Sequence, residues 1–277
     1  MRTYQGSWWT AGIDAGGTWI RIRARRQRAV RELRAPAHGD LGAIVRRAWH
    51  DWNVSARDVG VLVVASRGVW TPAERRRAEQ RLRGLARRVR VMSDAEAAHE
   101  GALGGRAGLL ILAGTGSIAI GRDARGRWHR AGGLGPLLGD EGSAFWIGRA
   151  WLRARWHGGA VTAVRAALAS PTPVASMAAL APGVLRRARR GDRVACRIVR
   201  AAQEELTRLA GEAGRALRLP EPWPLSWGGS LLVRDTWFRG GLARAMTRAG
   251  LRVRWIAPVE PPVRAAERLA SGMLRHP

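Results

Sequence analysis

The sequence predicts an α/β protein built from two modest domains. Its 277 residues are enough to form two separate hydrophobic cores. Two apolar runs, beginning at Trp8 and Leu109, each lead into a glycine-rich turn and then into a second alternating run. Segments with strand and helix periodicity follow each of these hairpin patterns. The two halves therefore share a general organisation, although we find no strict sequence repeat.

The first half begins with a predicted β-hairpin over residues 8–23, whose turn is Asp14-Ala15-Gly16-Gly17-Thr18. Helical spacing follows over 41–52. The continuous apolar run over 59–65 is typical of a strand that is buried on both faces of a sheet. This order of elements is that of an α/β domain.

Two capping-box patterns mark helix starts in the same half. Residues 71–74 (TPAE) combine the capping box with proline at the first helical position, and the helix is expected to continue to about Arg88. A short strand over 89–92 precedes the second pattern, residues 93–96 (SDAE), which opens a helix to Leu103. Asp94 therefore lies where a strand ends and a helix begins.

The second half opens with residues 114–119 (GTGSIA), which match the G-x-G-x-x-A pattern of a dinucleotide-binding turn. Such a turn needs a helix directly after its glycines, because the helix N-terminus holds the pyrophosphate. Residues 121–128 (GRDARGRW) are a poor helix. We therefore expect a hairpin with strands over 109–113 and 118–121, followed by a strand over 128–131.

Helices dominate the rest of the chain. Residues 192–217 have a continuous apolar stripe, which predicts a long amphipathic core helix. A strand over 224–227 leads into Gly228-Gly229, and a helix over 237–249 ends at a glycine. The remaining predicted elements are a strand over 252–256 and a closing helix over 261–274.

The charge of the chain is strongly positive, at +27, yet every basic residue is arginine and none is lysine. Residues with AT-rich codons are scarce, so a GC-rich genome explains the arginines more simply than nucleic-acid binding, and the arginines are dispersed along the chain. No specific nucleic-acid partner is expected. Without lysine, a P-loop and a Schiff-base enzyme are excluded.

The single cysteine, Cys196, excludes a disulfide framework and a cysteine-rich metal or iron–sulfur site. No apolar run is long enough to span a bilayer, and the opening MRTYQGSWWTAG has no cleavage-site pattern. We therefore expect a cytoplasmic protein without a membrane partner.

The two glycine-rich turns have the chemistry of phosphate binding. Both combine glycines with a threonine, so they can present backbone N–H groups and a hydroxyl to phosphate oxygens. Asp14, beside the first turn, is suited to hold Mg²⁺ through water, because this ion keeps most of its hydration shell. Asp94 would be fixed by the backbone and favoured as an anion by the helix N-terminus.

Each of these residues also has a simpler structural interpretation. In isolation, Asp14 and Thr18 are ordinary turn residues, and Asp94 is a helix cap. Asp140 and Glu141 form the acidic first turn of a helix in the commoner use of such a pair. The occurrence of all the motifs in one order favours the functional interpretation.

Two further glycine-rich stretches complete the pattern, residues 132–143 (GGLGPLLGDEGS) and the pair Gly228-Gly229. Together the motifs resemble the BadF/BadG/BcrA/BcrD-type ATPase family, and within it the N-acetylglucosamine kinase branch of the actin–hexokinase–Hsp70 superfamily. The family pattern reads D-x-G-G-T, S/T-D-A, G-T-G-S, G-G-W-G-x-x-x-G-D-E-G-S and a late G-G. The resemblance covers most of the chain and is strongest over 93–148.

The resemblance implies an α/β fold of two ribonuclease-H-like domains with a nucleotide-binding cleft between them, the actin-like ATPase fold. The N-terminal domain would comprise residues 1–105, with the closing helix 262–277 packed back on it. The C-terminal domain would comprise 106–261 and carry helical insertions.

The resemblance also implies ATP-dependent phosphorylation of an amino sugar, N-acetylglucosamine or glucosamine, on its primary hydroxyl. Asp94 would be the general base, and Asp14 would face Mg²⁺ through water. The nucleotide would be held by Asp14, Gly16, Gly17, Thr18, Gly114, Thr115, Gly116, Gly228 and Gly229. The sugar would be bound by His38, Asp94, Gly133, Leu134, Gly135 and Asp140.

Three positions depart from the family pattern. Leu134 stands where the family has tryptophan, and Ala35-Pro36-Ala37-His38 stands where the kinases carry an asparagine that binds sugar. His38 would replace that amide as a hydrogen-bonding group. A third departure, Arg264-Ala265-Ala266 for G-A-A, lies near the C-terminus.

Two alternatives remain beside the kinase. One is a non-catalytic sugar or nucleotide sensor of the same fold. The other is an ATPase of the same family that acts on a protein partner, although such activators carry cysteines for a bridging iron–sulfur cluster and this chain has one cysteine. A homodimer is common among similar proteins and stays open.

Overall fold

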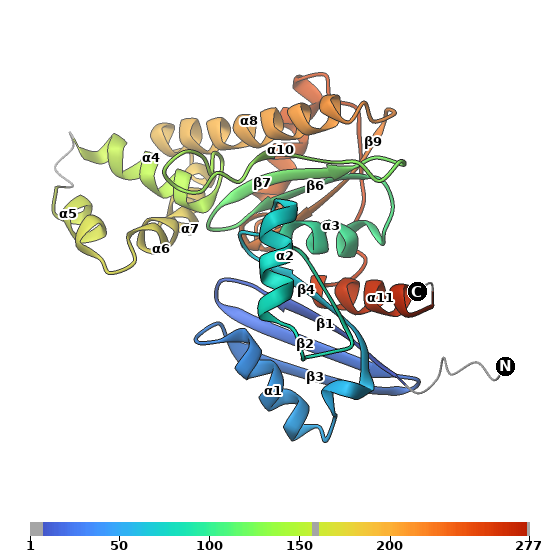
Figure 1. Ribbon diagram of the computed structural model, residues 1–277. Helices are drawn as coiled ribbons and strands as arrows, with labels where there is room; N and C mark the ends of the chain where they lie inside the picture. The colour runs from blue at the N-terminus through green and yellow to red at the C-terminus, as the bar shows by residue number, and fades with distance from the viewer. Residues whose placement is uncertain (1–7, 157–160, 276–277) are drawn as a thin grey trace. The chain divides into compact units, whose positions relative to one another are not determined.

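The computed structural model describes residues 8–156 and 161–275. The first seven residues of the N-terminal stretch considered above lie outside these ranges. The chain divides into two compact units, with Met1–Gly105 and Val259–Pro277 in unit 1 and Arg106–Pro258 in unit 2 (Figure 1). Unit 1 is therefore discontinuous in the sequence, and unit 2 is one continuous segment.

Unit 1 contains a five-stranded sheet in the order β3-β2-β1-β4-β5. Strands β1, β2 and β3 pair antiparallel, and β4 and β5 run parallel to β1. The elements in chain order are β1 (Trp9–Ala15), β2 (Trp19–Arg26), β3 (Ala29–Pro36), α1 (Leu41–Asp51), a short 3-10 helix (Ala56–Asp58), β4 (Val59–Ser66), α2 (Pro72–Arg81), β5 (Arg88–Ser93), α3 (Asp94–Leu103) and α11 (Pro262–Arg275).

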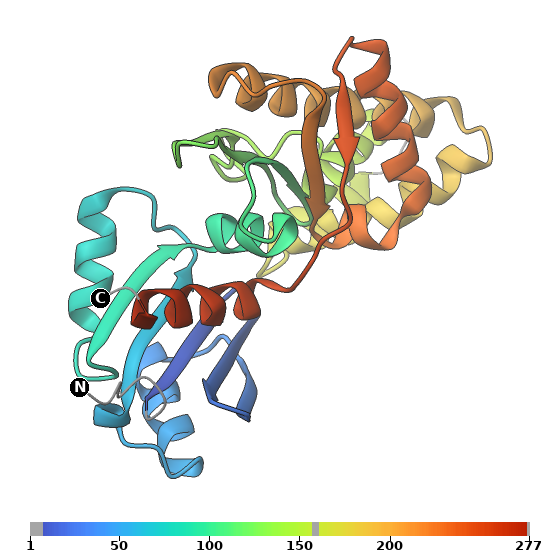
Figure 2. The same cartoon turned by 90° about the vertical axis from the view of Figure 1, so that its right-hand side faces the viewer.

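Both faces of this sheet are covered, as the continuous apolar run of β4 predicts. Leu62 and Val64 pack in a core with Trp49 of α1 and Leu82, which follows α2. Val61 and Val63 alternate with them and point to the opposite face, where they pack against α11. Figure 2 shows α11, in red, lying along the sheet.

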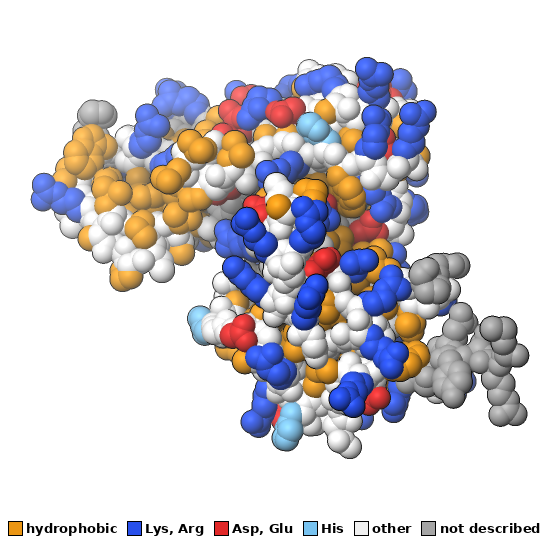
Figure 3. Space-filling model, in the orientation of Figure 1, with side chains coloured by type: hydrophobic (Ala, Val, Ile, Leu, Met, Phe, Trp, Pro, Cys, Tyr) orange, Lys and Arg blue, Asp and Glu red, His pale blue; other side chains and the backbone are white. Residues whose placement is uncertain are grey.

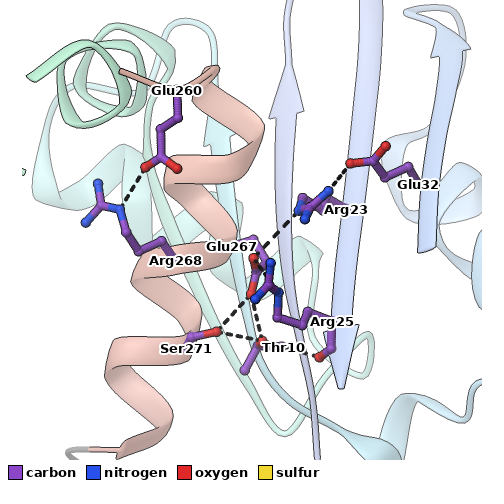
Figure 4. Close-up of polar contacts among 8 residues, drawn as sticks. All are labelled: Thr10, Arg23, Arg25, Glu32, Glu260, Glu267, Arg268 and Ser271. Carbon is purple, nitrogen blue, oxygen red and sulfur yellow. Dashed lines mark hydrogen bonds and ion pairs between the residues drawn. The ribbon is translucent and has the colours of Figure 1, made fainter. Parts of the chain in front are cut away.

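Helix α11 is fixed to the sheet by a buried acidic residue. Glu267 is 5% exposed and accepts hydrogen bonds from Thr10 (3.2 Å) and Ser271 (2.8 Å). Its carboxylate also lies 3.7 Å from Nε of Arg23 and 3.5 Å from Nε of Arg25 (Figure 4). Because a buried charge is costly without partners, this cluster requires α11 to lie on β1 and β2.

The backbone of α11 also approaches β1 directly. A Cβ atom added at Gly12 would lie 2.2 Å from the backbone nitrogen of Glu267, so only glycine fits at this point of the strand. Helix α3 lies on the same face of the sheet. Together, α3 and α11 cover the side that carries Thr10, Gly12 and Asp14.

Unit 2 repeats the strand arrangement of unit 1. Its five-stranded sheet has the order β10-β9-β6-β7-β8, with β6, β7 and β8 antiparallel and β9 and β10 parallel to β6. Its elements are β6 (Gly108–Ala113), β7 (Ser117–Arg122), β8 (Trp128–Gly132), α4 (Ala144–Trp156), α5 (Val161–Ala169), α6 (Pro173–Ala178), α7 (Ala181–Arg189), α8 (Arg193–Ala216), β9 (Trp223–Gly228), α9 (Ser230–Arg234), α10 (Thr236–Arg248) and β10 (Val253–Trp255).

The long helix α8 forms the centre of the unit 2 core. Its stripe includes Ala202, Leu206 and Leu209, which pack with Leu109 and Ile111 of β6. The amphipathic stripe in the sequence therefore identifies the helix that covers this sheet. Asp192 caps the helix by accepting hydrogen bonds from two backbone N–H groups in the first turn.

One expectation from the sequence is wrong, and one strand is absent from the predicted elements. The helix opened by the first capping box ends at Arg81, where Leu82 and Leu85 turn into the core, and does not reach Arg88. Strand β3 was not expected, because its exposed residues have no apolar alternation. His99 of α3 is fully buried.

Arginine side chains are spread over the visible face of both units in Figure 3. This distribution agrees with the dispersed pattern in the sequence. No helix among the described residues is long and apolar enough to cross a membrane.

Candidate functional site

The candidate residues of unit 1 lie at one edge of its sheet. Strands β1, β4 and β5 are parallel, so their carboxyl ends meet at this edge, and the β1–β2 turn and the end of β3 are there too because Trp19 pairs with Pro36. The candidates placed at this edge by the topology are His38, Asp14, Gly16, Gly17, Thr18 and Asp94. Ligand sites are common outside the carboxyl ends of strands in α/β sheets.

Asp14 lies near the end of β1 and is 9% exposed. It pairs across the hairpin with Arg21, whose Nη1 donates a hydrogen bond to Oδ2 of Asp14 at 3.1 Å. Burial raises the pKa of Asp14 above its ordinary value of 3.8, the Arg21 charge and hydrogen bond oppose this, and the negative charge of Asp94 adds to it. Asp14 and Asp94 therefore form a pair of acidic groups close enough to interact.

The glycine turn after β1 is closed by its own backbone. The N–H of Gly16 donates to the carbonyl of Trp19 at 3.1 Å, and Gly17 and Thr18 are exposed at the tip. The N–H of Ala37 donates to the carbonyl of Thr18 at 3.1 Å, which places the exposed His38 next to this turn in the chain. The turn is therefore open to a ligand on its outer side.

Asp94 is the first residue of α3 and is held by a complete capping box. The Ser93 hydroxyl accepts from the N–H of Glu96 (3.1 Å), and the Glu96 carboxylate accepts from the N–H of Ser93 (2.9 Å). Arg75 of α2 donates to the same Glu96 at 2.6 Å. Because Ser93 is fully buried, the backbone that carries Asp94 is fixed while its side chain stays half-buried.

The candidate residues of unit 2 also meet at one edge of a sheet. Gly114, Thr115 and Gly116 form the β6–β7 turn, and the N–H of Gly114 donates to the carbonyl of Gly116 at 2.9 Å. Gly228 ends β9 beside it and Gly229 follows, and a Cβ at Gly229 would lie 2.3 Å from the carbonyl oxygen of Ala113. Gly229 is thus required because its backbone packs directly against Ala113, at the end of the strand that leads into the β6–β7 turn.

Asp140 contacts the same β6–β7 turn through its carboxylate. It is 8% exposed, and its Oδ1 accepts from the N–H of Ser117 at 3.1 Å. A Cβ at Gly116 would lie 2.6 Å from that oxygen, so the carboxylate and the turn are in close contact. Asp140 also has a positive φ of 62°. The sequence predicts that this residue binds sugar, and the contacts give it a role in holding the turn.

The remaining sugar-site candidates follow β8. Gly133 and Gly135 have φ values of 70° and 80°, which favour glycine. Leu134 is 60% exposed between them. Leu137 and Leu138 in the same loop are also exposed, so this loop presents an apolar surface at the edge where the turn lies.

A cavity of about 580 Å³ opens beside the β6–β7 turn, within unit 2. Leu185 and Leu231 supply apolar lining. The polar lining residues are Thr115, Ser230, Asp235 and the arginines Arg186, Arg189 and Arg234. Its volume is in the range of pockets that hold a small molecule. A nucleotide whose phosphates meet Thr115 would therefore have space for its base and ribose in this unit.

The sequence missed two parts of these sites. Helices α6 and α7 contribute alanines, Leu185 and two arginines to the cavity lining, and neither helix carries a motif that could have identified it. The side chain of Arg67, directly after β4, lies beside the first glycine turn, because a Cβ at Gly17 would lie 2.8 Å from its Nη1. It is one of many arginines in the sequence, and only its place at the strand end distinguishes it.

The comparisons with known proteins find the same family that the sequence motifs resemble. A sequence model of the BadF/BadG/BcrA/BcrD ATPase family matches residues 11–249. The chain is 45% identical over 65 residues to an N-acetylmuramic acid/N-acetylglucosamine kinase of Clostridium acetobutylicum, covering 24% of this chain and 21% of that one. It is 50% identical over 46 residues to an N-acetyl-D-glucosamine kinase of Dictyostelium discoideum, covering 17% of this chain and 14% of that one. These matches thus span about a fifth or less of the length of the two relatives.

Solved structures resemble almost the whole chain. A protein of Chromobacterium violaceum, provisionally named an N-acetylglucosamine kinase, has a TM-score of 0.70 at 23% identity and covers 96% of this chain and 99% of its own. A protein of Porphyromonas gingivalis with the same provisional name has a TM-score of 0.70 at 18% identity and covers 95% and 99%. At these identities the likeness establishes the fold, which is the actin-like ATPase fold predicted from the motifs.

Proposed function

Because the chain belongs to the BadF/BadG/BcrA/BcrD ATPase family, we propose that it is an ATP-dependent kinase of an amino sugar. The substrate would be N-acetylglucosamine or glucosamine, phosphorylated on its primary hydroxyl. The two relatives matched in sequence are both named as kinases of N-acetylated amino sugars, which supports this substrate class.

The residues of each unit suit an ATP complex with Mg²⁺. Asp14 would hold the ion through water, and no group of three or more acidic, histidine or cysteine side chains among the described residues is arranged to replace it. One carboxylate with phosphate oxygens and water is the usual environment of this ion at a nucleotide. When bound, Mg²⁺ neutralises phosphate charge during phosphoryl transfer. The raised pKa of Asp14 reflects burial and the nearby Asp94, and a cation there would favour its ionised form.

The observation that carries the proposal is the position of Asp94 relative to the first glycine turn. In the sheet of unit 1, Ala15 is level with Ser66, and Ser66 is level with Ser93. The residues that follow at this edge are Gly16 and Asp94, a phosphate-binding turn and a carboxylate separated by a single strand. A base that accepts the proton of a hydroxyl beside the terminal phosphate would need this arrangement.

Each remaining candidate has a role in this scheme. Gly16, Gly17 and Thr18 would bind phosphate from unit 1, and Thr115 with its neighbouring glycines would bind it from unit 2. The Gly228-Gly229 pair and the cavity beside it would hold the adenosine. His38, Asp140 and the Gly133–Gly135 loop would form the sugar site, in which Leu134 would contact the sugar ring.

The test is release of ADP by the purified protein with Mg-ATP, across amino sugars, plain hexoses and muramic-acid derivatives. We expect release that depends on an amino sugar, and a fall of roughly 10²- to 10⁴-fold in the Asp94→Asn variant, which loses the base. Asp58→Asn is the matched control. Asp58 is an exposed carboxylate that directly precedes β4, at the edge of the sheet opposite to Asp94.

The outcomes separate the alternatives. Full activity in Asp94→Asn would contradict the proposed mechanism. ATP hydrolysis that no sugar stimulates would favour the ATPase that acts on a protein partner. Binding of ATP and sugar by calorimetry without turnover would favour the sensor.

A further inference from the structure

Arg67 is a cationic side chain at the phosphate-binding edge of unit 1. It directly follows β4, and its Nη1 would lie 2.8 Å from a Cβ atom on Gly17. The guanidinium therefore occupies the face of the turn that the missing side chain of Gly17 leaves open. The residue is exposed, so a ligand bound by the turn would meet it from solvent.

The sheet register places Arg67 between the phosphate turn and the proposed base. Ala15, Ser66 and Ser93 are level on three adjacent strands. The next residues on these strands are Gly16, Arg67 and Asp94. Arg67 therefore lies between the two ends of the proposed transfer. A phosphoryl group that moves from a nucleotide at the turn to a hydroxyl beside Asp94 would move past the end of β4, which carries Arg67.

Within the part of the chain that the structure describes, Arg67 differs from Arg21, an arginine at the same edge, in having no acidic partner. Asp14 and Asp94 are both acidic, and Arg21 is already paired with Asp14. Among the described residues, no carboxylate forms an ion pair with the guanidinium of Arg67, and its side chain makes no hydrogen bond. An exposed guanidinium without an acidic partner, beside glycine N–H groups, is suited to a phosphate, which it can bind through two parallel hydrogen bonds.

We propose that Arg67 binds the terminal phosphoryl group of ATP and stabilises the charge on it during transfer. This inference rests on the proposed function, because it names the group at the same site that contacts the transferred phosphate. Arginine in such a position lowers the barrier electrostatically, since the charge on the phosphoryl oxygens is neutralised where the reaction occurs.

The first experiment measures nucleotide binding without turnover. Dissociation constants of the magnesium complexes of ADP and of a non-hydrolysable ATP analogue are measured by calorimetry for the wild type, Arg67→Gln and Arg67→Lys. Because ADP lacks the terminal phosphate, we expect Arg67→Gln to weaken binding of the analogue by about tenfold and to leave ADP binding unchanged. Arg67→Lys keeps the charge but loses the bidentate geometry, and its loss is expected to be smaller.

Arg28→Gln is the matched control. It removes the same charge from an exposed position of the same sheet, but in the β2–β3 hairpin at the opposite edge, next to the pairing of Arg26 with Ala29. Its nucleotide affinities are expected to equal those of the wild type. A general effect of net charge would instead weaken both variants alike and would overturn the assignment of Arg67.

The second experiment measures turnover with the amino sugar. Arg67→Gln is expected to lower kcat by about 10³-fold and to leave KM for the sugar unchanged, as for arginines that stabilise the transferring phosphate. Guanidinium ion added to Arg67→Ala is expected to restore part of the rate, which a residue with only a structural role would not allow.

The results distinguish this inference from the proposed function. Equal loss of ADP and analogue binding, or no loss of either, would overturn the role of Arg67 alone. A wild type that binds both nucleotides but phosphorylates no sugar would contradict the kinase, and the difference between the two nucleotides would still decide whether Arg67 contacts the terminal phosphate. A wild type that binds neither nucleotide would overturn both.

Discussion

The position of Asp14 in the candidate site destabilises the folded protein at neutral pH, because it buries a carboxylate. Its carboxylate is buried near Asp94, and these two effects outweigh the stabilising contact with Arg21, so its pKa is raised in the folded state. A raised carboxyl pKa means that the folded state binds a proton more tightly than the unfolded state. The contribution of this group to stability is therefore complete below pH 3.8 and is lost as the pH rises through the raised pKa.

We accordingly predict that Asp14→Asn raises the melting temperature at pH 7. The neutral amide removes the buried charge, while Arg21 is 43% exposed and can be solvated when its partner is lost. The difference should shrink as the pH falls towards 4, where the wild-type carboxyl becomes neutral as well. Thermal unfolding of both proteins at several pH values measures this. A variant that melts below the wild type at pH 7 would show that the contact with Arg21 outweighs burial.

At the scale of single elements, two capping boxes allow a matched comparison. Both boxes are complete, but Ser93 is fully buried and carries Asp94 at the edge of the sheet, whereas Thr71 is exposed at the start of α2. Each hydroxyl satisfies one backbone N–H in the first turn of its helix, so each substitution by alanine should cost about 1 kcal/mol of unfolding free energy.

The two variants are predicted to differ in activity. Ser93→Ala frees the backbone that positions Asp94, so the proposed phosphorylation of an amino sugar should fall by on the order of tenfold or more at temperatures where the protein stays folded. Thr71→Ala should lose stability and retain activity. Chemical denaturation and steady-state kinetics on both variants provide the measurement, and equal activities in the two would contradict the positioning role of the Ser93 cap.

Elements with a clear physical pattern were predictable from the sequence. Both capping boxes, the apolar run of β4 and the stripe of α8 describe local contacts that recur wherever such residues occur. Strand β3 was not predictable, because it is an edge strand in which Arg31, Glu32 and Arg34 interrupt the apolar residues and no residue is fully buried. The end of α2 at Arg81 was missed because the chain turns where Leu82 and Leu85 find a core that only the folded sheet provides.

The candidate site, which stays a prediction, can be located from the sequence only where its residues form continuous motifs. The glycine turns and Asp94 could be located from the sequence, since each turn is a short segment with a local conformational requirement. The approach of Arg67 to Gly17 depends on the parallel pairing of β1 and β4, which are far apart in the chain. The contact of Asp140 with the Gly116 turn depends in the same way on the return of the loop after β8.

At the scale of the whole molecule, the two units have the same strand arrangement, but unit 1 is built from two separate segments of the chain and unit 2 from one. Unit 2 is a single segment with its own large core around α8. Unit 1 needs α11, whose Ala266 and Ala270 cover Val61 and Val63 on one face of the sheet. Without α11, that face and the buried polar atoms of Thr10 and Arg23 would be exposed, and the ion pair with Glu267 would be lost.

We therefore predict that deletion of residues 259–277 unfolds unit 1 and leaves unit 2 folded. Hydrogen exchange read out by mass spectrometry should show fast exchange of β1, β2 and β4 in the truncated chain, because uncovered apolar strands cannot remain closed. Slow exchange should persist in β6 and α8. A fragment of residues 106–258 should melt cooperatively by itself, whereas a fragment of 1–105 should not. Protection of β4 in the truncated chain equal to that in the full chain would mean that the remaining helices suffice for the fold of unit 1, and that α11 serves another purpose than covering this sheet.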